Sequence, residues 1–183
     1  MTMPTFTDGV VVHAVDLTKL PTGINNLNTL LTGAVAPKVI VPTATARINV
    51  GHSIANATDT VLTFDVAGVN NEAIWVAGQQ AFTIVTAGVY IAWAQGSYVA
   101  NATGIRTAHI LLNGTSVASN SVARGAIAAP SGTDLATFSL KTAPMSLAVG
   151  ATLYFSAWQS SGGSLSLDQT LSGTHMSVMR VGA

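Results

Sequence analysis

The sequence predicts an all-β protein, built as an antiparallel β-sandwich or jelly roll. About nine short segments between residues 46 and 183 are dense in Val, Ile, Thr and aromatic residues, a composition typical of strands. Clusters of Gly, Asn, Pro and Ser separate the segments, and no long helical pattern lies between them. Many short strands joined by turns, without intervening helices, favour two packed antiparallel sheets.

Turn signals place the strands and the longer loops. Asn113-Gly114 is the sharpest short turn, since both residues tolerate a positive φ. Segments 98–104, 124–134 and 160–173 are rich in small residues, so we expect them to form loops at the sandwich ends, where they could carry recognition. The possible recognition residues are Tyr98, Asn101 and Arg124. The predicted strands are 46–53, 60–66, 81–85, 88–99, 105–112, 116–122, 135–141, 152–159 and 174–181.

Several of these strands are apolar on both faces. An antiparallel sandwich with one wet face would instead alternate apolar and polar side chains. One face can fill the core, whereas the other face needs a second partner to cover it. A neighbouring copy of the chain is the simplest such partner. The pattern leaves open which face meets that copy. The candidate core or interface residues are Tyr90, Trp93, His109, Tyr154 and Trp158.

Residues 1–45 differ from the rest in their residue pattern, with spaced leucines and little strand alternation. We interpret them as an anchoring arm and linker, and residues 46–183 as the jelly-roll domain. Spaced leucines predict two short helices separated by Pro21, and the prolines of 34–42 predict an extended linker. Helices this short are not stable alone in water, so their apolar face needs a partner. Packing under the β domain is one alternative, but the linker favours docking to another protein. The candidate anchoring residues are Phe6, Leu17, Leu20, Ile24, Leu27, Leu30 and Leu31.

The composition excludes several classes of function. Only 8% of residues are charged, against about 25% in an average soluble domain, so much of the surface is either buried in an assembly or covered by small polar residues. Seven basic and seven acidic residues are scattered along the chain, which argues against a nucleic-acid partner. Cysteine is absent, which excludes disulfides and thiol chemistry. We expect neither a signal peptide nor a membrane-spanning segment, and therefore synthesis in a cytoplasm.

No motif for catalysis or metal binding stands out. Asp168, His175 and a serine could be drawn as a triad, but no Gly-x-Ser-x-Gly elbow supports it, so we expect no enzyme activity. No histidine pair or calcium-loop pattern occurs. Asp65 and Glu72 flank a turn and are interpreted as solvated carboxylates. His109 is interpreted as a core or interface histidine, with a pH-sensitive or metal-binding role as the alternative. No cofactor is expected.

The order of the predicted elements resembles the tumour-necrosis-factor and complement-globular-head superfamily of trimeric jelly rolls. The resemblance covers roughly residues 46–183, and Ala151 stands where that superfamily usually has Asp after the turn glycine. It implies a jelly-roll fold and a homotrimer. The matching segments are 81–90, 110–115, 147–153 and a closing strand from 174 to 181.

The N-terminal segment resembles the start of many tailed-phage structural proteins. It reads Phe6-Thr7-Asp8-Gly9, then Asp16-Leu17 and Leu20-Pro21, with Thr18 where Asn is common. This resemblance implies a virion component whose arm binds the major capsid protein or another virion protein. A capsid decoration or head-fibre trimer is the leading hypothesis. The alternative is a tail-associated module that recognises a host surface glycan or protein receptor.

Overall fold

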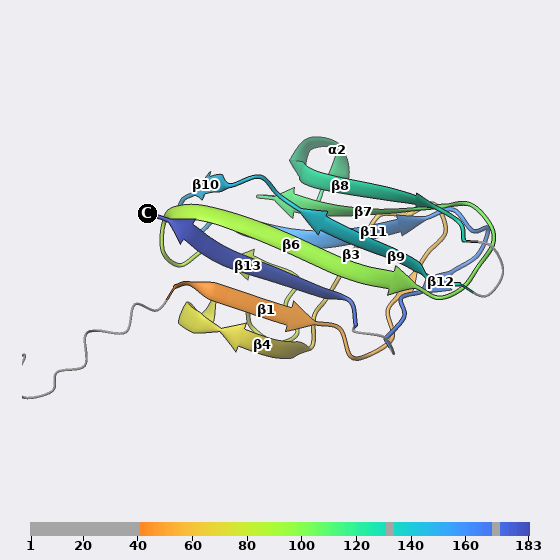
Figure 1. Ribbon diagram of the computed structural model, residues 1–183, viewed down its shortest axis with the longest axis horizontal. Helices are drawn as coiled ribbons and strands as arrows, with labels where there is room; N and C mark the ends of the chain where they lie inside the picture. The colour runs from red at the N-terminus through yellow and green to blue at the C-terminus, as the bar shows by residue number, and fades with distance from the viewer. Residues whose placement is uncertain (1–40, 131–133, 170–172) are drawn as a thin grey trace, which may run out of the picture. The chain divides into compact units, whose positions relative to one another are not determined.

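Two antiparallel sheets pack face to face in the computed structural model, which describes residues 41–130, 134–169 and 173–183 (Figure 1). The first sheet has six strands and lies in front in Figure 1. Its order is β4-β1-β13-β6, and β10 and β9 pair with successive parts of the remaining edge of β6. The bounds are β1 Thr43–Arg47, β4 Val66–Asn70, β6 Gly88–Tyr98, β9 Ala136–Lys141, β10 Met145–Leu147 and β13 His175–Gly182.

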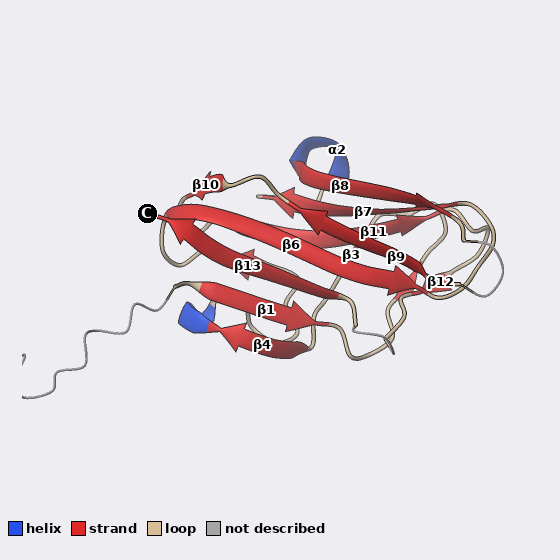
Figure 2. Ribbon diagram, in the orientation of Figure 1, coloured by secondary structure: helices blue, strands red, loops and turns tan. Residues whose placement is uncertain are grey.

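The second sheet has five strands in the order β8-β7-β11, with β3 and β5 both along the far edge of β11. The short pair β2–β12 and two single-turn helices complete the described elements, as Figure 2 shows. The bounds are β2 Ser53–Ile54, β3 Thr60–Val61, β5 Phe82–Thr83, β7 Ile105–Leu112, β8 Ser121–Ala128, β11 Thr152–Gln159, β12 Leu165–Ser166, α2 Val117–Asn120 and the 3-10 turn η3 Asn71–Ala73.

The core lies between the sheets. Phe155 of β11 and Phe138 of β9 meet with ring centroids 5.7 Å apart, and Tyr98 of β6 packs 5.8 Å from Phe138. Tyr90 is fully buried on the same face of β6, and its hydroxyl donates to the Thr86 carbonyl at 2.6 Å. Burying these polar tips is tolerated because each hydroxyl has an acceptor.

The all-β sandwich predicted from the sequence is confirmed, and β7 and β11 coincide with the predicted strands 105–112 and 152–159. The strand predicted at 116–122 is wrong: α2 occupies most of it and β8 follows. Asn113 adopts the expected positive φ of 54°, yet the turn leads into α2 rather than directly into a strand. β1 begins at Thr43, so the boundary predicted between residues 45 and 46 falls inside this strand.

The two ends of the sandwich differ in character. At one end the chain enters at Val41, the C-terminal strand finishes, and Arg180 N–H donates to the Pro42 carbonyl at 2.9 Å (Figure 1). At the other end loops gather: Ala129 N–H donates to Gly104, and Ser160 N–H donates to Ile105. The prediction that the longer loops cluster at a sandwich end is confirmed for residues 99–104 and 160–164, whereas residues 124–128 of the third predicted loop lie in strand β8. We name these the entry end and the loop end.

Candidate functional site

The outward face of the six-stranded sheet carries an apolar patch, which we name the β6–β13 patch and define as Val89, Ile91, Trp93 and Met179. Alternation along β6 sends Tyr90, Ala92 and Ala94 into the core, so the odd-numbered residues must point outward. In the register of the sheet, Ile91 lies opposite Met179. Directly opposed side chains on one face touch, so these residues form a continuous surface.

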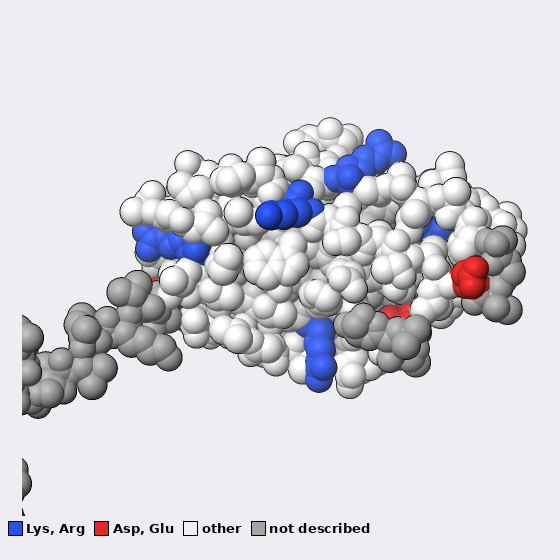
Figure 3. All heavy atoms as spheres, viewed as in Figure 1, with Lys and Arg blue, Asp and Glu red and all other residues white. Residues whose placement is uncertain are grey.

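Polar groups border the patch. Lys141 pairs with Trp93 from the β9 side, and Arg47 is exposed on β1. Beyond Trp93, the Thr45 and Ser177 hydroxyls hydrogen-bond at 2.8 Å. Figure 3 shows a broad uncharged field on this face with a few basic groups at intervals. In the described part of the chain, no segment crosses β6 or β13 on this side (Figure 1).

The outward face of the five-stranded sheet is covered differently. Leu111 of β7 points away from the main core, yet it is fully buried, because α2 packs over this strand. The chain therefore covers part of this face by itself. The second apolar face of β7 needs no other subunit, whereas the β6–β13 patch has no such cover among the described residues.

The five residues predicted as core or interface accordingly separate into three groups. Tyr90 is in the core, and Trp93 lies in the β6–β13 patch. His109, Tyr154 and Trp158 belong to the outward face of the other sheet, where the register places Trp158 opposite Thr107 and His109 opposite Ser156. A single flat interface cannot include both Trp93 and Trp158, because they face opposite sides of the sandwich.

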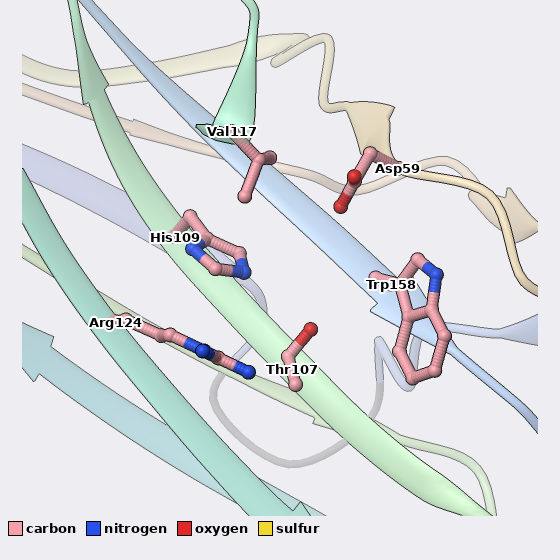
Figure 4. Close-up of a pocket in the computed structure, with 6 residues that line it drawn as sticks. All are labelled: Asp59, Thr107, His109, Val117, Arg124 and Trp158. Carbon is pink, nitrogen blue, oxygen red and sulfur yellow. The ribbon is translucent and has the colours of Figure 1, made fainter. Parts of the chain in front are cut away.

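A cavity of about 240 Å³ opens on the outward face of the five-stranded sheet, as Figure 4 shows. His109 and Thr107 come from β7 and form its floor, while Arg124 of β8 and Trp158 of β11 flank them. Asp59 precedes β3 and reaches the cavity beside Trp158. The lining residues are Asp59, Thr107, His109, Val117, Arg124 and Trp158.

His109 is the most buried ionisable group of this cavity, with 4% of its surface exposed. Its Nδ1 lies 3.1 Å from the Ser121 hydroxyl, which can donate or accept according to the tautomer. Burial lowers the pKa of His109 below its usual 6.5; the Asp59 carboxylate opposes this effect, and the Arg124 guanidinium adds to it. The neutral imidazole is therefore the favoured form at neutral pH.

This histidine makes stability depend on pH. The unfolded chain retains a His109 pKa near 6.5, so below that pH the unfolded state binds more protons than the folded state. The free energy of unfolding should therefore fall as the pH drops from above 6.5 through the lowered folded pKa. We expect His109→Gln to show a smaller loss of melting temperature between pH 7.5 and pH 5 than the unmodified chain. Calorimetry at both pH values checks this, and equal losses in the two proteins would contradict it.

The structure corrects the predicted loop position of two of the three possible recognition residues. Tyr98 is fully buried and donates its hydroxyl to the Trp158 carbonyl at 3.0 Å, so it is a core residue. That burial raises the pKa of Tyr98. Arg124 lies in strand β8, not in a loop, and it lines the cavity. Asn101 does lie in a loop, where its side-chain oxygen accepts from Thr103 N–H at 2.9 Å.

Asn101 is held in place by a buried arginine that the sequence reasoning missed. Arg106 is fully buried at the loop end and donates from Nη2 to both oxygens of Asn101, at 2.7 and 3.2 Å, and from Nη1 to the Thr103 carbonyl. Three acceptors from one short loop fix that loop to β7. No sequence signal distinguishes such an arginine from an exposed one.

Other chemistry predicted from the sequence has a structural explanation. Asp65 accepts from Asn49 N–H at 2.7 Å, and Glu72 accepts from the Thr86 hydroxyl at 2.8 Å, so each carboxylate links two segments of the chain. The residues that the structure describes contain no group of three or more His, Asp or Glu able to hold a metal ion. They also contain no helix long and apolar enough to cross a membrane. The anchoring residues predicted in the arm lie outside the described residues.

Comparison with solved structures decides the fold. The globular domain of zebrafish complement 1qA protein matches 76% of this chain and 97% of its own, with a TM-score of 0.51 and 13% identity. Murine APRIL matches 78% of this chain and 100% of its own, with a TM-score of 0.57 and 12% identity. The chain has a jelly-roll fold. No protein-family model and no curated protein sequence matches it, so the shared jelly roll establishes architecture alone.

Proposed function

We propose that this jelly-roll chain is a non-enzymatic structural protein of a phage virion, assembled as a homotrimer and fixed to the particle by its N-terminal arm. The observation that carries the trimer is the β6–β13 patch, an apolar surface that the described chain does not cover. Its four side chains are already partly covered within the sheet, so burying their remaining exposed area contributes less per side chain than the about 1.5–3 kcal/mol of full burial. A second copy of the same chain is the partner that is always present.

The choice of three copies comes from the resemblance of the sequence to trimeric jelly rolls, which the jelly-roll fold supports at the level of architecture. In a closed ring the patches of all copies can face one common axis, where they are covered together. Light scattering on the full chain tests this: we expect three times the 18.6 kDa mass of a single chain at micromolar concentration. A stable monomer would overturn the proposal.

The entry end supports attachment of the trimer through that end. Val41, Val85, Val149 and Val181 are all exposed there, at 43%, 46%, 65% and 46% of their surface. Val181 is near the end of β13, and Val85 and Val149 lie in the turns before β6 and after β10, whose ends the register of the sheet places together. Exposed apolar side chains grouped at one end favour a contact surface, and the arm would approach its target from the same end.

The arm is expected to bind the particle through its leucines. Leu27→Asp together with Leu30→Asp in the full chain should leave the trimer intact but lower its copies per purified particle at least tenfold. Each leucine contributes about 2 kcal/mol of burial, and three arms per trimer multiply the effect. Asn25→Asp together with Thr29→Asp is the control, because it adds two charges to the same segment on the opposite side of the predicted helix. Gel densitometry measures the copies, and unchanged copies of the double variant would contradict the anchoring role.

The same gel densitometry distinguishes a location on the capsid from a location on the tail. Hundreds of copies of the unmodified chain per particle would indicate capsid decoration, in which many trimers bridge neighbouring capsid subunits. A few copies would indicate the second candidate, a tail-associated module that binds a host surface. The observation that favours this second candidate is the cavity around Trp158, which lies on the sheet opposite the β6–β13 patch and so stays accessible in the proposed trimer.

A further inference from the structure

We propose that the cavity on the five-stranded sheet binds one ring of a neutral saccharide, with Trp158 as its platform and Asp59 and Arg124 as its hydrogen-bonding partners. This goes beyond a structural role, and the binding itself does not require the trimer. The argument rests on the volume of the cavity, its unpaired polar groups, its aromatic wall and its balance of charge.

The volume suits a single sugar ring. The cavity has a volume of about 240 Å³. An extended peptide or a nucleic-acid segment needs a longer groove, whereas one pyranose ring is of this scale. The cavity opens to solvent between β3 and β8, so a terminal sugar of a longer chain could enter while the rest stays outside.

The polar groups of the wall are free to bind. Within the residues that the structure describes, the side chains of Asp59, Arg124 and Trp158 make no hydrogen bond, and Asp59 and Arg124 form no ion pair. Thr107, with 6% of its surface exposed, lines the floor of the cavity. Figure 4 shows these groups arranged around a common space. Asp59 and Arg124 are exposed, so a ligand that displaces their water can use their hydrogen-bonding groups.

The aromatic wall favours a ligand with an apolar face. Trp158 is partly exposed, and its indole is the largest flat surface of the cavity. A pyranose presents C–H groups on its faces and hydroxyls around its rim. Such a ring can pack on the indole while its hydroxyls donate to the Asp59 carboxylate and accept from the Arg124 guanidinium.

The charge balance selects a neutral sugar. Asp59 and Arg124 carry opposite formal charges, and the buried His109 favours its neutral form, so the cavity has no net charge. An acidic sugar would place its carboxylate near Asp59 as well as Arg124, so repulsion from Asp59 would offset the attraction to Arg124 and the carboxylate would add little affinity. A phosphate group would meet one basic residue only. Hydroxyls, which both donate and accept, use both charged groups.

Titration of the full chain with a sugar panel tests this inference. The neutral probes are D-glucose, D-galactose, D-mannose, N-acetyl-D-glucosamine and their short oligomers, and the acidic probes are D-glucuronic acid and N-acetylneuraminic acid. Calorimetry or saturation-transfer NMR reports binding. We expect millimolar binding of at least one neutral probe, weakened at least tenfold by Trp158→Ala and by Asp59→Asn, and partly retained by Trp158→Phe.

Tyr154→Ala is the matched control. Tyr154 lies on the same face of β11 as Trp158 and is partly exposed, but it does not line the cavity. Its loss should leave sugar binding unchanged. Circular dichroism shows whether each variant is folded, and Asp59→Asn provides the test if Trp158→Ala is not. The inference would be overturned if only the acidic probes bound, or if no probe bound. It would also be overturned if the Trp158 and Asp59 variants bound sugar as tightly as the unmodified chain. A chain that binds sugar as a monomer would support this site and refute only the proposed trimer.

Discussion

Replacing Ile91 by aspartate is expected to convert the proposed trimer into monomers. Ile91 lies at the centre of the β6–β13 patch, opposite Met179. The change removes apolar contact worth less than about 2 kcal/mol, because Ile91 is already partly buried in the single chain. It also places an unpaired carboxylate in the contact, which costs a few kcal/mol more. Repeated at every contact of the ring, these losses should raise the dissociation constant at least about a thousandfold.

Sedimentation velocity of the full chain measures this effect, and circular dichroism confirms that the jelly roll still forms. Val122→Asp is the control: Val122 is 37% exposed on β8, in the opposite sheet, so the same change there should leave the mass unaltered. If Ile91→Asp remained trimeric while Val122→Asp dissociated, the subunit contact would lie on the five-stranded sheet instead.

The largest loss of stability is expected from Gly104→Ala at the loop end. Gly104 has a φ of +78°, a conformation that costs an L-residue about 1–2 kcal/mol. A methyl group there would also overlap the backbone carbonyl of Ser160, which the neighbouring hydrogen bonds hold in place. Overpacking of this kind costs typically about 1–3 kcal/mol. We expect a total of about 2–5 kcal/mol, or roughly 10 °C in melting temperature.

Gly78→Ala separates the two contributions. Gly78 has nearly the same φ, +80°, but a methyl group there would meet nothing within 4 Å. This variant should therefore lose only the backbone contribution, about 1–2 kcal/mol, corresponding to a few degrees. Differential scanning calorimetry at one protein concentration compares the two variants. Equal shifts would show that the loop moves to accommodate Gly104→Ala and that Ser160 does not restrain it.

The strands that the sequence predicted well are those with strong local signals. β7 contains β-branched Ile and Thr residues, β11 contains three aromatic residues, and both strands coincide with their predicted ranges. β8 was missed because Ser121–Ala128 contains Ala, Gly and Arg, which have low strand propensity. It forms because the edge of β7 supplies hydrogen-bonding partners along its length. Pairing of this kind depends on residues distant in sequence and is absent from local patterns.

The candidate site was only partly predictable for a related reason. Trp93 and Trp158 both appeared in strands that are apolar on two sides, and nothing local indicates which sheet contains each strand. Arg124 was noticed as the single basic residue of its segment, but its neighbours across the sheet, His109 on β7 and Trp158 on β11, come from elsewhere in the chain. The cavity is a product of that register.

From its sequence alone this protein was determined to be an antiparallel β-sandwich without cysteine chemistry, since strand propensity, turn residues and composition are local properties. The tertiary structure decided that Tyr90 faces the core while Trp93 faces outward, and that Asp59, Arg124 and Trp158 surround one cavity. When both faces of a strand are apolar, no polar side marks the solvent, and only the packing of one sheet against the other chooses the orientation.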